Sequence, residues 1–256
     1  MSSGGSVVRT VTGIPRTATS RVVTALTNGQ AYTFAVRAVN GFGNGPLSAE
    51  SNSVVPVGLP GAMAAPVADR DDRSVFLDWT APASDGGSPV TTYRITVRTG
   101  TTVVRTLDVA APATSTLVTG LTNGTAYNFR VAAINALGTG PLSAASNTVT
   151  PATVPGVPGI LAPTQGAAGG ALTASANWSA PTSTGGSAIT NYRVRAMRMA
   201  ADGTTVVGTP VVNIVGAAAR TRSFTLPAGQ YRFEVIAINS VGDGLSSARS
   251  TLVAPR

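Results

Sequence analysis

The chain has 256 residues, with 18 cationic and 10 acidic side chains for a net charge of +8, and it contains no histidine and no cysteine. Every one of the 18 cations is an arginine. The chain therefore lacks the usual ligands of zinc, haem and iron–sulfur sites, the base of His-dependent triads and the lysine of Schiff-base chemistry. The composition excludes those classes of enzyme and metalloprotein, and only oxygen-ligated calcium or magnesium stays open.

The remaining composition favours an all-β fold. Aromatic residues make up 5% and charged residues 11%, and 29 Gly and 17 Pro interrupt a sequence rich in Thr, Val, Ala and Ser, which is typical of many short strands and turns. The first residues show neither the basic nor the apolar region of a signal peptide. No apolar run approaches the roughly 18 residues of a membrane span, so we expect no membrane insertion.

One pattern occurs three times along the chain. LTNGQAYTFAVRAVN starts at Leu26, LTNGTAYNFRVAAIN at Leu121, and the weaker LPAGQYRFEVIAIN at Leu226. A period near 100 residues is too long for a solenoid repeat and suits a whole β-sandwich domain. We therefore expect three copies, bounded as residues 1–58, 59–154 and 155–256.

The first copy, residues 1–58, is expected to be incomplete. The letters VVRT at Val7 recur in the middle of the second copy, so the strands that precede them there have no counterpart here. Alternation over Tyr32, Phe34 and Val36 indicates a strand with one apolar face. Leaving such side chains in water costs about 1.5–3 kcal/mol each, so we expect this copy not to fold alone.

The second copy shows the alternation of a half-buried strand. Tyr127, Phe129 and Val131 face one way, whereas intervening residues such as Ala132 are expected to face outward. The same alternation surrounds a tyrosine further upstream, and both features recur in the third copy. The residues predicted to form the cores of these two copies are Trp79, Tyr93, Tyr127, Trp178, Tyr192 and Tyr231.

These features together resemble the fibronectin type III family in its bacterial form. They are a Trp followed by Ala-Pro and a Gly-Gly-Ser loop, a Tyr on the next strand, and Leu-x-Asn-Gly-x-x-Tyr before the following one. The resemblance implies tandem immunoglobulin-like β-sandwiches, with only strands C′, E, F and G of the family in residues 1–58. The third copy departs from the motif, since Ala228-Gly229 replaces Asn-Gly. The resemblance specifies the fold and says little about function.

Pro-rich segments join the copies, at residues 55–60 and 151–158. Because proline restricts the backbone, these segments are predicted to be semi-rigid spacers.

Candidate interface residues come from three features: the apolar row of the incomplete copy, the apolar tips of two Gly-rich loops, and a basic sheet face in the third copy. For the loop tips, packing on the adjoining copy and binding of a partner stay open. Arginines alternate along two neighbouring strands of the third copy, beside Glu234, and predict a partly neutralised ladder. The eight candidates are Tyr32, Phe34, Val36, Phe42, Leu137, Arg193, Arg195 and Arg232.

The positive charge is concentrated at the two ends of the chain. Residues 1–58 hold four arginines and one acid, the second copy six of each, and the third copy eight arginines and three acids. An anionic surface polymer is a candidate partner. The arginines are dispersed and lack interleaved aromatics, so we expect no nucleic-acid binding.

Function is predicted to be structural rather than enzymatic. The ten carboxylates are dispersed and nothing predicts a cleft, so we expect no catalytic residues, no metal and no cofactor. The main hypothesis is an assembly protein of an extracellular fibre, a surface appendage or a phage tail. Strands from a neighbouring chain, expected to be a copy of the same protein, would complete residues 1–58 and propagate a filament.

Two alternatives stay open. The missing strands of the first copy are encoded upstream of Met1, or the chain is a spacer of a secreted bacterial polysaccharide-degrading enzyme.

Overall fold

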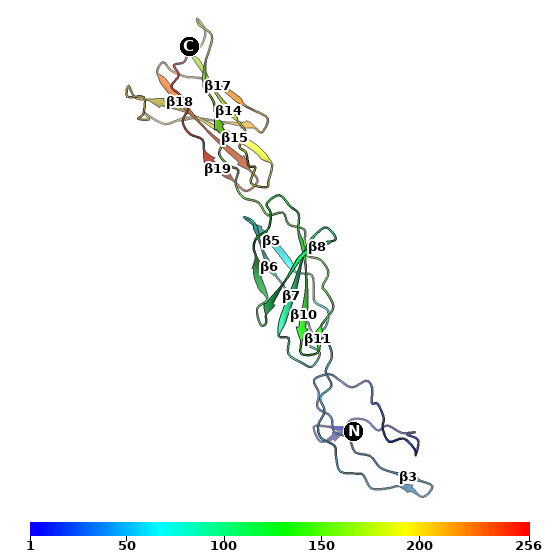
Figure 1. Cartoon of the computed structure of the whole chain (residues 1–256). Helices are drawn as coiled ribbons and strands as arrows, with labels where there is room; N and C mark the ends of the chain where they lie inside the picture. The colour runs from blue at the N-terminus through cyan, green and yellow to red at the C-terminus, as the bar shows by residue number, and fades with distance from the viewer. The chain divides into compact units, whose positions relative to one another are not determined.

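The computed structural model describes all of residues 1–256, and every regular element in it is a β-strand (Figure 1). The all-β expectation is therefore confirmed. The structure contains no helix long and apolar enough to cross a membrane. The chain divides into two compact units, each of which contains one of the Pro-rich joints. The first unit is Met1–Ala68, Leu77–Thr116 and Asn128–Asn147, and the second is Asp69–Phe76, Leu117–Tyr127 and Thr148–Arg256.

Residues 1–58 form two ribbons of two-residue strands in place of the four sandwich strands expected. Single bridges join Ser2 to Thr33 and Tyr32 to Val54. The expected C′ and E strands do not form, because residues 1–58 contain no strands of the kind that these two pair with in a complete sandwich, and a two-stranded ribbon alone is marginal. The ribbons are β1–β2 and β3–β4, with strands β1 (Ser2–Ser3), β2 (Ser6–Val7), β3 (Val39–Asn40) and β4 (Gly43–Asn44).

The middle copy contains a four-stranded and a three-stranded antiparallel sheet. The four-stranded sheet has the order β11-β10-β7-β8, and β10 lies opposite β7 with Phe129 facing Val97 and Val131 facing Ile95. The other sheet has the order β5-β6-β9. The bounds are β5 (Val67–Asp71), β6 (Ser74–Asp78), β7 (Thr92–Thr99), β8 (Thr102–Ala110), β9 (Ser115–Val118), β10 (Asn128–Asn135) and β11 (Gly138–Thr139).

The last copy repeats this order, and its central strands β15 and β18 are longer than their counterparts β7 and β10. One sheet is β16-β15-β18-β19, and the other is β12-β14-β13 with β17 paired to β14. The long strands β15 and β18 pair over almost their whole length. The bounds are β12 (Gly159–Ile160), β13 (Thr164–Gln165), β14 (Thr173–Ser179), β15 (Ile189–Met199), β16 (Val211–Gly216), β17 (Thr221–Thr225), β18 (Gln230–Asn239) and β19 (Asp243–Ser246).

Aromatic pairs at matching positions occupy the core of each of these copies. The ring centroids of Trp79 and Tyr93 are 5.5 Å apart, and those of Trp178 and Tyr192 are also 5.5 Å apart. The remaining two aromatics predicted for the core, Tyr127 and Tyr231, are also buried. The strand periodicity of two places these rings on the same inner face of the sheets.

Ala132 on β10, predicted to face outward, is nevertheless buried. Its register partner on β7 is Arg94. A methyl group directly opposite a long arginine stem is shielded from solvent even on the outer face of a sheet.

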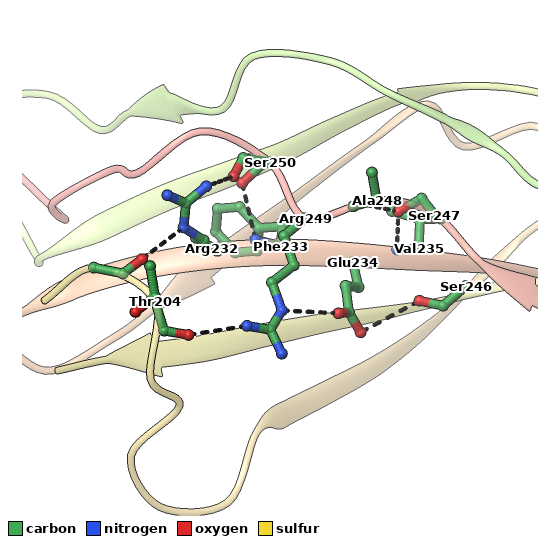
Figure 2. A network of polar contacts seen from close by, with 11 residues as sticks. Thr204, Arg232, Phe233, Glu234, Val235, Ser246, Ser247, Ala248, Arg249 and Ser250 are labelled. Atoms are coloured by element: carbon green, nitrogen blue, oxygen red, sulfur yellow. Dashed lines mark hydrogen bonds and ion pairs between the residues drawn. The ribbon is translucent and has the colours of Figure 1, made fainter.

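Serine side chains complete the outer edge of β10 and of β18. The hydroxyls of Ser143 and Ser146 accept the backbone N–H groups of Val131 and Phe129 at 3.0 Å each. Ser247 and Ser250 do the same for Val235 and Phe233, as Figure 2 shows. Buried N–H groups that would otherwise lack a partner are thereby satisfied without a regular neighbouring strand.

Candidate interaction sites

The joint between the middle and last copies is held by backbone hydrogen bonds. Gly124 donates to the carbonyl of Pro151 at 2.9 Å, so the turn of the middle copy binds the first residue of the joint. Further along, Thr153 donates to the carbonyl of Gly185 at 2.8 Å. The Pro-rich segment is therefore anchored at both sides and is more than a passive spacer.

The joint after the first copy repeats these bonds at matching positions. Gly29 donates to Pro56 at 2.9 Å, and Gly58 donates to Gly86 at 2.7 Å. The recurrence of both bonds at both joints indicates one joint design, used twice.

Paired glycines allow the closest approach in each joint. A Cβ atom on Gly186 would lie 2.5 Å from the amide nitrogen of Gly124, and one on Gly87 would lie 2.2 Å from that of Gly29. Both Gly87 and Gly186 also have a positive φ, 82° and 85°, which side chains disfavour. Any side chain at these positions would force the two turns apart.

An asparagine side chain ties each joint to the following copy. The amide of Asn239 donates to the carbonyls of Thr153 and Thr184 at 2.8 and 2.9 Å. Asn135 makes the matching pair of bonds, both 2.8 Å, to Gly58 and Asp85. Both asparagines are buried, so their amide groups need these partners.

The sequence did not reveal these joints as sites. The Gly-Gly-Ser segments were identified only as loops, and no role was predicted for the two asparagines. The signal that could have revealed the joints is that a Gly-Gly pair and an Asn recur together at fixed places in both copies. A turn by itself does not require that Asn.

In residues 1–58, the same positions are open. Asn40 corresponds to Asn135, and its side-chain oxygen accepts the N–H of Phe42 at 3.0 Å, but Asn40 is exposed. Tyr32 is buried with 5% exposure, Phe34 is half-buried, and Val36 is 69% exposed. The strand position of Val131, which is fully buried in the middle copy, is therefore open to solvent at Val36 of the first copy.

The loop tips carry exposed apolar side chains. Phe42 is fully exposed, and Leu137 is 55% exposed. Next to Leu137, the backbone of Gly138 approaches the side chain of Leu59, to which a Cβ atom would come within 3.2 Å. The loop backbone thus meets the joint, while the tip side chain remains free.

The basic face of the last copy is neutralised differently from the predicted ladder. The register places Arg195 opposite Glu234. However, Arg193 forms its ion pair with Asp243, and Glu234 forms one with Arg249 at 3.3 Å. Only the tertiary structure brings Asp243 and Arg249 to these positions.

Arg232 is engaged within the fold. Its guanidinium donates to the carbonyls of Gly203 and Ser250 at 3.0 and 2.6 Å, and Arg249 donates to that of Thr204 at 3.1 Å (Figure 2). Both arginines thereby hold the loop after β15 against β18. Of the three predicted basic interface residues, Arg232 is the one whose guanidinium binds backbone carbonyls.

Two surface carboxylates have perturbed acidity. The hydrogen bond from the Arg94 guanidinium lowers the pKa of Asp108, and hydrogen bonds from Thr205 and Thr204 lower the pKa of Asp202. Hydrogen bonds from neighbouring residues of the fold therefore explain the lowered pKa of both carboxylates. Across residues 1–256, no three Asp or Glu side chains gather into a possible metal site.

Comparison with known proteins finds similarity to one family over the middle copy. The family model "Fibronectin type III domain" matches residues 63–149. The human "Fibronectin type-III domain-containing protein 3A" is 33% identical over 136 residues, which are 53% of this chain and 11% of that protein.

Two further relatives are bacterial. "Endoglucanase B" of Cellulomonas fimi is 38% identical over 60% of this chain and 15% of its own length, and "Chitinase A1" of Niallia circulans is 34% identical over 58% and 20%. The chain thus spans no more than a fifth of the length of these three relatives.

A solved structure of chicken CNTN1 FN1–FN3 domains aligns with 90% of this chain and 77% of that one, at 18% identity and a TM-score of 0.39. The family match rests on the middle copy, where the buried Trp79–Tyr93 pair and the strand order lie. Residues 63–149 of this chain are therefore similar in sequence to the fibronectin type III domain family.

Proposed function

We propose that the chain is a non-enzymatic structural protein, in which β-sandwich modules are joined in series and hold their neighbours in place. We place it in an extracellular fibre, a surface appendage or a phage tail. Residues 1–58 serve as the point where a neighbouring chain joins. The observation that carries the proposal is the recurrence of one hydrogen-bonded joint at both module boundaries.

The joint supports this role through its stiffness. A flexible linker leaves neighbouring modules free to reorient, whereas proline, backbone bonds and a buried asparagine restrict the segment that connects them. A structural array needs such restriction, because each module must transmit force to the next module and fix its orientation.

Substitution of Gly186 tests the proposal. A side chain there would clash with the amide of Gly124, so G186A should release the last copy from the joint. Nitrogen-15 NMR relaxation of the full chain measures the effect. In the parent chain, residues on either side of the joint at 151–158 should share one rotational correlation time, and in G186A the last copy should tumble faster on its own.

Gly169 offers a matched control. It has a similar φ, 82°, but a Cβ atom there would meet nothing within 4 Å. G169A therefore adds the same backbone strain without touching the joint, and should leave the correlation times unchanged. Independent tumbling already present in the parent chain would overturn the proposal.

A second candidate function is a spacer within a secreted polysaccharide-degrading enzyme. It is favoured by the similarity to an endoglucanase and a chitinase, each covering well over half of this chain. The two functions share the joint and differ in what the polypeptide carries beside it. A hydrolase domain in the flanking coding sequence would select the spacer role.

A further inference from the structure

The backbone edge at Ala35 and Arg37 of the first copy lacks the strand that pairs with the matching edge in the middle copy. In the middle copy, β10 lies against β7, with Arg130 opposite Thr96 and Ala132 opposite Arg94. The residues at the places of Arg130 and Ala132 in the first copy are Ala35 and Arg37. On this edge Ser2 of β1 bridges Thr33, and no strand in residues 1–256 pairs with Ala35 or Arg37 beyond that bridge.

The opposite edge is already occupied. Ser51 donates to the carbonyl of Phe34 and Ser48 to that of Val36, both at 2.8 Å. Successive residues of a strand direct their backbone groups to alternate sides. The N–H and C=O groups of Ala35 and Arg37 are therefore the ones presented to an incoming strand.

An apolar face lies behind this edge. Phe129 and Val131 of the middle copy are fully buried, whereas their counterparts Phe34 and Val36 are half-buried and 69% exposed. In the middle copy the neighbouring strand β7 extends this apolar face with alternating large apolar residues, and Val97 lies opposite Phe129. The covering strand for residues 1–58 needs the same alternation.

Charge then selects among strands of that pattern. The position of β7 that would face Arg37 is held by Arg94, and its counterpart on β15 is Arg193. Either strand of this chain would thus place an arginine directly opposite Arg37, and like charges in directly opposed positions are destabilising.

The first copy also lacks the acids that neutralise those arginines in the other copies. Arg94 pairs with Asp108 and Arg193 with Asp243. The residues aligned with Asp108 and Asp243 in the first copy are Thr12 and Asn44. Residues 1–58 form no ion pair, and their single acid, Glu50, accepts a hydrogen bond from Thr33.

We propose that the edge of Ala35 and Arg37, with Phe34 and Val36 behind it, is a docking site for an extended segment of a different protein. That segment alternates large apolar residues and carries Asp or Glu opposite Arg37. This inference rests on the proposed function, in which residues 1–58 join a neighbouring chain, and it specifies that the neighbour is not a second copy.

Two peptides built on β7 test the inference against the full chain. The peptide TYEITVRT is residues 92–99 with Arg94→Glu, and TYRITVRT is the unchanged strand, which stands for a second copy. NMR titration at millimolar peptide should show binding of the first, with shifts and slowed hydrogen exchange at the amides of Ala35 and Arg37. The affinity for the acidic peptide should be about three- to fivefold higher.

Charge reversal in the protein provides the control. R37E should invert the preference between the two peptides. R21E changes the net charge equally at an exposed arginine outside the strand, and should leave the preference unchanged. Arg37 is exposed and forms no ion pair, so both variants should keep the parent's circular dichroism spectrum.

Each result has a defined meaning. Equal binding of both peptides, or a preference that R21E shifts as much as R37E, would overturn the charge selection and leave the joining role standing. Binding of neither peptide would overturn the docking site itself. Concentration-dependent association of the parent chain that R37E abolishes would identify a second copy as the occupant. Amides of Ala35 and Arg37 already protected in a longer natural form of the chain would identify a preceding segment instead.

Discussion

At the scale of single residues, buried polar side chains carry contacts that backbone strands do not supply. Ser143 is 2% exposed, and its hydroxyl accepts the N–H of Val131 and donates to the carbonyl of Ala144. An unsatisfied buried N–H group costs about 1–3 kcal/mol. The Ser143 hydroxyl therefore determines whether the backbone N–H of Val131, at the edge of β10, has a hydrogen-bond partner.

Replacement of Ser143 by alanine should lower the free energy of unfolding of the middle copy by about 1–3 kcal/mol. Denaturant unfolding followed by Trp79 fluorescence, in a chain with Trp178→Phe, reports this copy alone because the chain has 2 Trp. Thr148→Ala, at an exposed position nearby, should change the same quantity by less than about 0.5 kcal/mol. Equal effects from both substitutions would contradict the role given to the hydroxyl.

At the scale of the element, one strand pattern leads to different environments in the first and middle copies. Residues 32–38 and 127–133 share their apolar alternation, yet Val131 has no exposure and Val36 is 69% exposed. The difference comes from the paired strand β7 and the second sheet, β5-β6-β9, neither of which has a counterpart in residues 1–58. A strand is therefore only as buried as its neighbours make it.

Val131→Ala should destabilise the middle copy by about 2–3 kcal/mol, since it leaves a cavity in a packed core. Val36→Ala should change stability by less than about 0.5 kcal/mol, because its side chain already contacts water. Differential scanning calorimetry of the full chain compares the two variants. A clear loss of stability in Val36→Ala would show that residues 1–58 are covered in solution.

At the scale of the whole molecule, stability is divided unevenly along the sequence. Tyr32 is the one buried residue of residues 1–58, whereas β10, β15 and β18 each carry a row of buried side chains. Regions with few buried contacts open at low free energy. The first copy should therefore be the least protected part of the chain.

Hydrogen exchange measured by mass spectrometry should show residues 1–58 exchanging close to the rate of an unstructured peptide. The amides of β10 and β18 should exchange only on unfolding of their copies. Addition of the acidic peptide TYEITVRT should slow exchange within residues 33–39 and leave β18 unaffected. Protection of residues 1–58 comparable to that of β18 without peptide would contradict this division.

Much of the architecture was accessible from local patterns. The alternation around Tyr127 and Tyr231 and the turn residues between strands predicted an all-β chain with repeated sheets, because strand periodicity and turn chemistry are written in neighbouring residues. Burial of Ala132 and the partners of Arg193 and Glu234 were not accessible. Their neighbours lie on other strands, and alternation says nothing about which side chains meet there.

The sequence by itself determined the class of fold, the repeat and the absence of His, Cys and Lys chemistry, since these follow from composition, period and spacing. Only the tertiary structure decided that the joints are bound segments, because Gly186 meets Gly124 and Asn239 meets Thr153 across a distance in sequence that no local pattern records. It also decided that Arg37 borders an uncovered edge. Packing and hydrogen bonding between segments distant in the sequence determine which surfaces remain open for a partner.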